Sequence, residues 1–237
     1  MKRPWISWAA ALAAAYGLKL IYSRAAAADL AWILVPTARA VGWLRGETLT
    51  FDPAGGWVAP DGSYVIAPAC AGVSFLILVL TVAVLGFAHR LRSPRARLGW
   101  WLGSAAGAYL FTIAVNTLRI VAAVALYRLG PIAGLTPGQL HRLLGIVIYL
   151  GALWGLYAAL DQLTGGQRAG ALLVVGAYLG MTLVVPLLTG HPGTRYAEHA
   201  MMVSLITALF LGGWWAWVRL RKAGTQGTAG TPGTAKA

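Results

Sequence analysis

The sequence predicts an all-α fold, a polytopic transmembrane helical bundle of about seven helices of which six or seven span the membrane. Three observations support this prediction. The 237 residues are 59% hydrophobic and 11% charged, with a mean hydropathy of +0.70, whereas soluble domains are nearer half apolar and a quarter charged. Apolar runs near the membrane-crossing length recur along the chain and lack the alternation of barrel strands. Eleven Trp are scattered near the ends of these runs, as expected at headgroup level.

Each apolar run is expected to form one helix. The first one, behind Lys2 and Arg3, could pass for a signal peptide, but the many later runs favour an uncleaved helix. The second is short and holds Pro36 and Arg39, so we expect it to lie in the interface or to re-enter. The fourth exceeds a simple span and must tilt, kink or project. The seven runs fall at about 5–22, 29–45, 69–88, 98–128, 141–160, 169–189 and 199–218.

Basic residues predict the orientation of these helices. Four arginines within residues 89–97 indicate a cytoplasmic loop, and the basic residues of 219–222 agree with it across four intervening spans. The formal net charge of +13 therefore reflects membrane topology. Nucleic acid is excluded as a partner because its binding calls for one continuous basic face.

The N-terminal region leaves two topologies open. Lys2 and Arg3 fall on the side of the arginine-rich loop only if segment 29–45 does not span. The alternative is an outside N-terminus with Lys19 and Arg24 inside. We favour the first, because segment 29–45 is the weakest span.

Two segments lie outside the apolar runs. Residues 46–68 are the longest polar stretch, and a Gly/Pro/Asp-rich region between 48–51 and 63–66 suggests a small extramembrane hairpin; a solvated loop fits equally well. Residues 223–237 are predicted to be a disordered Gly/Thr/Ala-rich cytoplasmic tail. Residues 1–222 would then form a single polytopic membrane domain.

Three chemically capable side chains are predicted at one membrane depth. Counted at about 1.5 Å per helical residue from the cytoplasmic loop, Cys70, Arg119 and His141 each reach the outer end of a different helix. Polar groups in spans are costly unless paired, which makes them functional candidates. A helix N-terminus, an arginine and a histidine would each favour the thiolate of Cys70.

Each of these residues has a possible role. His141 could take the thiol proton and later protonate a leaving amine, and Arg119 could stabilise the thiolate, an oxyanion or a substrate carboxylate. Asn116, one turn before Arg119, could orient it. Pro68 suits a helix start, and Gly72 would allow a close approach of backbone or substrate.

Other interpretations stay open. Cys70 could be a packing residue, His141 could face the interface, and Arg119 could snorkel. His191 or His199 could serve as the base instead. Since the chain has one cysteine, an intramolecular disulfide and a Cys-rich metal site are excluded; no metal or cofactor is expected.

Three segments resemble the signature segments of exosortases and archaeosortases. They are Ile66-Ala67-Pro68-Ala69-Cys70-Ala71-Gly72-Val73, Asn116-Thr117-Leu118-Arg119-Ile120 and Leu140-His141-Arg142-Leu143-Leu144-Gly145-Ile146-Val147. The blocks 66–74, 116–120 and 140–147 occur in the family's order and spacing, and their wording is closest to the exosortase K branch. Many members have Cys-Ser-Gly where this chain has Cys70-Ala71-Gly72.

The resemblance implies a cysteine peptidase or transpeptidase of the cytoplasmic membrane of a prokaryote, with its active site toward the outer face. It implies that Cys70, Arg119 and His141 are catalytic. The substrates would be C-terminal sorting signals of exported proteins, each a motif, a membrane helix and a basic tail. A transporter or channel with a path lined by Arg119, Asn116 and His141 is the alternative, and a non-catalytic scaffold is a third.

Overall fold

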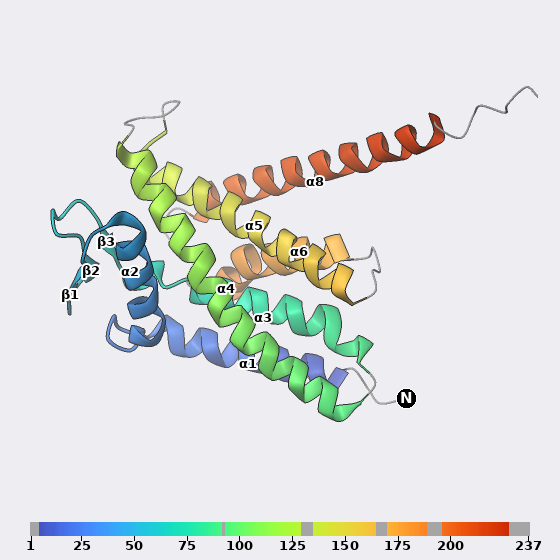
Figure 1. Ribbon diagram of the computed structural model, residues 1–237, viewed down its shortest axis with the longest axis horizontal. Helices are drawn as coiled ribbons and strands as arrows, with labels where there is room; N and C mark the ends of the chain where they lie inside the picture. Colours follow the sequence, from blue (N-terminus) through green and yellow to red (C-terminus); the bar gives the residue numbers. More distant parts are fainter. Residues whose placement is uncertain (1–4, 92, 129–134, 165–169, 189–195, 228–237) are drawn as a thin grey trace, which may run out of the picture. The chain divides into compact units, whose positions relative to one another are not determined.

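The computed structural model describes residues 5–91, 93–128, 135–164, 170–188 and 196–227 (Figure 1). Residues 1–193 and 194–237 form two compact units, and each is described by itself. The first unit contains α1 (Trp5–Ser23), α2 (Ala31–Arg45), α3 (Val73–Phe87), α4 (Pro94–Arg128), α5 (Pro137–Leu163), α6 (Gly170–Leu179) and α7 (Val185–Leu188). A π-helical turn, Gly180–Val184, joins α6 to α7, and 3-10 turns form at Pro68–Cys70 and Ala88–Arg90. The second unit contains α8 (Tyr196–Gly227).

The prediction of an all-α polytopic membrane protein is confirmed. Among the described residues, four helices are long and apolar enough to cross a membrane, and two shorter apolar helices, Ala9–Ser23 and Leu173–Leu188, accompany them. The four are Pro68–Arg90, Pro94–Arg128, Gly138–Leu163 and Tyr196–Ala216. As a continuous helix of 35 residues, α4 is about 52 Å long at 1.5 Å per residue. It therefore exceeds the hydrocarbon thickness, as expected for the fourth run.

Helices α1, α3 and α5 fix which ends of the first unit lie together. Ala11 of α1 packs with Val84 and Ala88 at the end of α3, while Lys19 Nζ donates to Ser74 Oγ at 3.3 Å near its start. These two helices are thus antiparallel. Arg90 donates to Asp161 at the end of α5, with 2.9 Å between Nη2 and Oδ1. The start of α1 and the end of α5 therefore both lie at the end of the bundle that carries the arginine-rich loop.

Helix α2 does not cross the bundle. It packs on α4, where the Trp32 and Tyr109 rings stack with centroids 5.9 Å apart and the Tyr109 hydroxyl donates to the Trp32 carbonyl at 2.6 Å. Because α1 ends and α3 begins at the same end of the bundle, the segment between them, which includes α2, starts and finishes at that end. This arrangement agrees with the favoured topology, in which segment 29–45 does not span.

Residues 46–68 form a small antiparallel sheet rather than a two-stranded hairpin. Its strands are β1 (Thr50–Asp52), β2 (Gly56–Val58) and β3 (Val65–Ile66), in the order β1-β2-β3. The two flanking segments predicted from the sequence do not pair with each other; both pair with β2, which falls in the region expected to turn. The chain reverses at residues 53–55, and Gly56 begins β2 with φ 115°, a conformation that glycine adopts at no steric cost. A Cβ there would overlap the Ile66 carbonyl oxygen, so glycine lets β3 pair.

The end of α8 differs from the expected tail. The helix continues to Gly227, five residues into the segment 223–237 predicted to be disordered; residues 228–237 lie outside the described residues. Lys222, Ala223 and Gln226 are good helix formers and can extend a long helix whose nucleation is already accomplished. The single membrane domain expected over residues 1–222 stays a prediction.

Candidate active site

Cys70 lies in a 3-10 turn just before the transmembrane helix α3. Pro68 opens this turn, and the Cys70 amide donates to the Ala67 carbonyl at 2.8 Å. Cys70 was expected to open the helix, but α3 begins only at Val73, with Gly72 as its N-cap. Gly72 has φ 75°, and this left-handed residue separates the cysteine turn from the helix. Cys70 is half-buried and packs against a hydrophobic cluster to which α2, α3 and α4 contribute.

The close approach expected at Gly72 is made by the side chain of Asn116 from α4. A Cβ atom at Gly72 would lie 3.2 Å from Asn116 Cγ and 3.2 Å from Thr112 Cγ2. That spacing is tighter than an ordinary van der Waals contact. The missing side chain of Gly72 therefore makes room for Asn116 to reach the cysteine turn.

Asn116 joins the cysteine turn to Arg119. It is fully buried, and its Nδ2 donates to the Cys70 carbonyl at 2.5 Å. Its Oδ1 accepts from Arg119 Nε at 3.2 Å and from the Tyr149 hydroxyl at 2.7 Å. One buried amide thus binds groups from the cysteine turn, α4 and α5, which satisfies the polar atoms that burial would otherwise penalise.

His141 is positioned by the start of α5. The Thr136 hydroxyl accepts from the Gln139 amide at 3.3 Å, and the Gln139 side chain accepts from the Thr136 amide at 2.9 Å. This capping box, with Pro137 as the first helical residue, fixes where the helix begins. His141 consequently lies in the second turn of α5, at the end of the bundle that also contains Cys70.

Arg119 and His141 are in direct contact. Arg119 is 7% exposed, and its Nη1 lies 3.2 Å from His141 Nε2. Because a guanidinium only donates hydrogen bonds, Nε2 is the acceptor, and a neutral imidazole then carries its proton on Nδ1. A Cβ atom at Gly145 would lie 3.7 Å from Arg119 Cδ, and the guanidinium lies 5.3 Å from the centre of the Tyr149 ring. The Arg119 side chain therefore packs against α5 between His141 and Tyr149.

The structure brings together all five residues singled out from the sequence. A hydrogen-bonded chain runs from the Cys70 carbonyl through Asn116 to Arg119 and His141, and Gly72 makes it possible. The Cys70 thiol itself shares neighbours with Arg119, because three tyrosines lie within electrostatic range of both side chains. They are Tyr22 of α1, Tyr127 of α4 and Tyr149 of α5.

Those tyrosines were missed by the sequence reasoning. Tyr127 follows Arg119 by eight residues, and Tyr149 follows His141 by eight. Two helical turns separate the members of each pair, so they share a helix face. That spacing could have identified both tyrosines. Because Arg119 contacts His141, a tyrosine on the helix face of Arg119 is expected near His141, and the Tyr127 and His141 ring centroids are 6.5 Å apart. The polar residue Tyr22 carried no such signal, since its neighbours come from other helices.

The alternative assignments of the base to His191 or His199 stay predictions. His191 lies outside the described residues, and His199 belongs to α8 in the second unit. His89 lies in the 3-10 turn at the opposite end of α3.

A second polar cluster lies outside the membrane-spanning helices, between α2 and the small sheet. Glu47 accepts from Arg45 Nε at 2.5 Å and from the Tyr64 hydroxyl. The hydrogen bond from Tyr64 lowers the pKa of Glu47 below its ordinary value, with Arg45 adding to the effect. Burial, together with the bond to Glu47, raises the pKa of Tyr64 to about 12.

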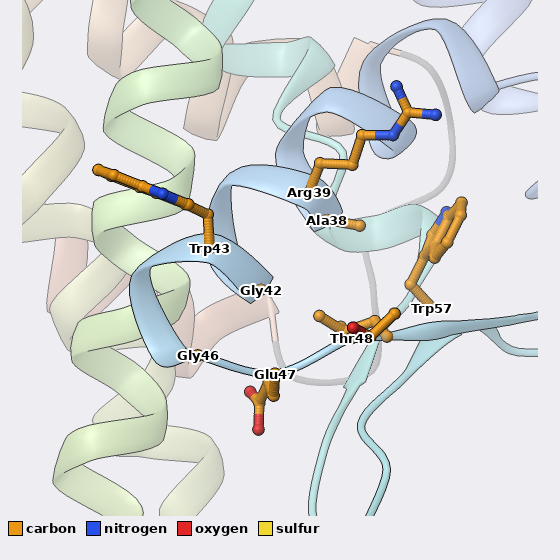
Figure 2. Close-up of a pocket in the computed structure, with 9 residues that line it drawn as sticks. Ala38, Arg39, Gly42, Trp43, Gly46, Glu47, Thr48 and Trp57 are labelled. Carbon is orange, nitrogen blue, oxygen red and sulfur yellow. The ribbon is translucent and has the colours of Figure 1, made fainter.

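A pocket of about 550 Å³ adjoins this cluster (Figure 2). Arg39 and Trp57 extend on one side of it, while Trp43 points away from them. Trp57 of β2 lines the pocket and pairs with Ile66 of β3 in the sheet. The pocket is therefore next to the strand that leads to Cys70. The lining residues are Ala38, Arg39, Gly42, Trp43, Gly46, Glu47, Thr48, Leu49 and Trp57.

Comparison with known proteins supports the resemblance. The family model described as transmembrane exosortase (Exosortase_EpsH) matches residues 4–158, which include all three resembling segments and more than half of the chain. No curated protein and no solved structure matches. The match does not distinguish branches of the family, so the K branch stays a prediction. The chain is a multi-pass membrane protein and belongs to the transmembrane exosortase family.

Proposed function

We propose that this protein is a membrane cysteine transpeptidase that cleaves C-terminal sorting signals of exported proteins through a thioester acyl-enzyme. Cys70 is the nucleophile, His141 the general acid and base, and Arg119 the group that stabilises the oxyanion. The observation that supports this proposal is the hydrogen-bonded chain from the Cys70 carbonyl through Asn116 to Arg119 and His141. It unites three segments of the chain at one end of the bundle.

The first half-reaction begins with transfer of the Cys70 thiol proton to His141. Sγ then bonds to the peptide carbonyl carbon, and the carbonyl oxygen becomes an oxyanion. For the thiol proton to move, Arg119 first exchanges its bond to His141 Nε2 for one to the substrate carbonyl oxygen, which leaves Nε2 open to take the proton; the same bond then stabilises the oxyanion. Collapse of the intermediate breaks the C–N bond, and His141 gives its proton to the leaving amine.

The second half-reaction releases the thioester. An acceptor amine or hydroxyl, or water, loses its proton to His141 and attacks the thioester carbonyl. The C–S bond breaks and the proton returns to sulfur. Cys70 is half-buried and Arg119 is buried, and such limited access of water would favour transfer over hydrolysis.

The location of the site fits a membrane-anchored substrate. Cys70 and His141 lie at the end of the bundle opposite the arginine-rich loop, and positive residues mark the cytoplasmic side. The site would therefore face the outer surface of the cytoplasmic membrane. A substrate whose C-terminal membrane helix lies in the same bilayer would present the chain next to that helix at this depth.

Trapping the acyl-enzyme tests the proposal. The full-length protein is co-expressed with exported reporters that carry C-terminal membrane anchors, and adducts on the peptide containing Cys70 are identified by mass spectrometry. Wild type should carry a reporter fragment that hydroxylamine releases, and Cys70→Ser should carry none or an ester resistant to hydroxylamine. Processed reporter in the presence of Cys70→Ala would refute the thioester mechanism, whereas the transporter alternative predicts no adduct even in wild type.

A further inference from the structure

Tyr149 occupies a place in the site that the proposed mechanism does not use. Its hydroxyl donates to Asn116 Oδ1 at 2.7 Å. Its ring stacks on Phe75 of α3, with centroids 4.3 Å apart and an interplanar angle of 10°, and its other polar neighbour is the Arg119 guanidinium. The ring is thus held between two helices while the hydroxyl is aimed at one amide oxygen.

The donors and acceptors around Asn116 allow only one orientation of its side chain. Arg119 Nε can only donate a hydrogen bond, and the Cys70 carbonyl can only accept one. Oδ1 must therefore face Arg119, and Nδ2 must face Cys70. The Tyr149 hydroxyl gives Oδ1 a second donor, so the correctly oriented amide is held from a third element, α5. In a buried site the loss of such hydrogen bonds is costly.

We infer that Tyr149 is a positioning residue, whose hydroxyl holds Asn116 in the orientation that fixes the Cys70 turn relative to Arg119. This inference rests on the proposed role of Cys70 as nucleophile. Tyr149 acts through Asn116 and touches neither the sulfur nor the peptide. Without the hydroxyl, Asn116 loses its bond to α5 and keeps only those to the Cys70 carbonyl and Arg119, so the Cys70 turn is held less firmly relative to Arg119.

The single cysteine gives a test that needs no substrate. In full-length protein, N-ethylmaleimide can alkylate Cys70 alone, and the pH profile of the alkylation rate reports how well the site stabilises the thiolate. The Tyr149→Phe variant keeps the ring, its stacking on Phe75 and its contact with Arg119. We expect alkylation at neutral pH to slow about 10-fold and the profile to move to higher pH.

A double-mutant cycle separates positioning from packing. In the Asn116→Ala background, Tyr149→Phe should have no further effect, because the acceptor of its hydrogen bond is gone. Tyr157→Phe is the matched control, since Tyr157 lies two turns further along α5 against Phe87, with ring centroids 5.2 Å apart; it should alkylate as wild type does. An unchanged profile for Tyr149→Phe, or additive effects in the cycle, would overturn the inference.

A second variant keeps the inference testable if Tyr149→Phe fails to fold. Asn116→Asp still accepts from Tyr149 and Arg119 but cannot donate to the Cys70 carbonyl, so it should show the same slower alkylation and shifted profile. Wild-type alkylation by Asn116→Asp would refute the inference. Failure of the proposed function is distinguishable, because it would appear as a missing acyl-enzyme in wild type and would leave the alkylation results intact.

Discussion

Arg119 Nη1 lies 3.2 Å from His141 Nε2, so a guanidinium and an imidazole from different helices meet directly, and no carboxylate of the described residues forms a salt bridge with either. The guanidinium is also bonded through Nε to Asn116. Arg119 therefore donates from two N–H groups of one planar guanidinium, Nε toward the cysteine turn and Nη1 toward the histidine. A lysine could keep the charge but not both directions.

Replacing Arg119 with Lys tests this dual role. We expect the rate of acyl-enzyme formation to fall by about 100-fold, the size found when a donor to a developing oxyanion is lost. Acyl-enzyme formation on Cys70 in intact membranes is the measurement. Arg95→Lys, an exposed arginine of the opposite loop, is the control and should retain wild-type rates. Equal rates for Arg119→Lys and wild type would mean that charge alone suffices.

Gly72 should tolerate no side chain. Gly72→Ala places a Cβ 3.2 Å from Asn116 Cγ on a residue with φ 75°, and the left-handed conformation alone costs an L-residue about 1–2 kcal/mol. We expect a lower midpoint of thermal unfolding in detergent and slower alkylation of Cys70. Gly103→Ala is the matched control, because a Cβ there meets nothing within 4 Å and alanine favours a helix; its midpoint should stay equal or rise.

The topology predicts which loops are accessible from outside the cell. In a Cys70→Ala background, Asp61→Cys in the small sheet region should react with a membrane-impermeant maleimide in intact cells. Ser93→Cys in the arginine-rich loop should react only after permeabilisation. Both residues are exposed, so accessibility within the protein is matched. The reverse pattern would invert the orientation and place the Cys70 site toward the cytoplasm.

The Glu47 cluster predicts an acid-sensitive extramembrane region. The pKa of Glu47 is lowered in the folded protein, chiefly by the hydrogen bond from Tyr64. Its stabilising contribution is therefore present above its ordinary pKa of 4.5 and is lost as the pH falls through the folded value. Hydrogen–deuterium exchange of residues 47–66, corrected for the intrinsic rate, should accelerate as the pH falls below the ordinary pKa of 4.5 and through the lowered pKa of Glu47.

The Glu47→Gln variant is the control for this transition. Its neutral side chain cannot titrate, so exchange in residues 47–66 should lose its acid step. The alkaline limb is distinct: the pKa of Tyr64 is raised to about 12 from 10, so its contribution is complete below pH 10 and is lost as the pH rises through about 12. An acid step that persists in Glu47→Gln would assign it to another carboxylate.

The sequence predicted the helices because hydrocarbon imposes a strong pattern on them. Runs such as 69–88 and 98–128 are read from composition and length alone, and counting residues from the arginine-rich loop placed Cys70, Arg119 and His141 at one end, where hydrogen bonds through Asn116 link them. The middle strand β2 was not predicted, because Gly56 and Trp57 lie within a region whose turn-forming residues dominate the local signal. Its pairing depends on partners on both sides, which local propensity does not describe.

The detail of the site depended on side-chain contacts that no spacing rule gives. Gly72 was expected to admit a backbone or a substrate, and the structure fills that space with Asn116. Cys70 was expected to be the first residue of a helix, but the left-handed Gly72 separates it from α3, which begins at Val73. The hydroxyl of Tyr149 binds Asn116 from a third element, a convergence fixed by helix packing rather than by any single segment.

Only Ala67 separates strand β3 from the turn that holds Cys70. The backbone that carries the Cys70 sulfur is thus an extension of the small sheet, while the apolar helix α3 begins three residues later, at Val73. Under the proposed function, the thiol would therefore lie where the membrane-spanning helix begins, and a peptide and an acceptor would reach it without crossing the hydrocarbon.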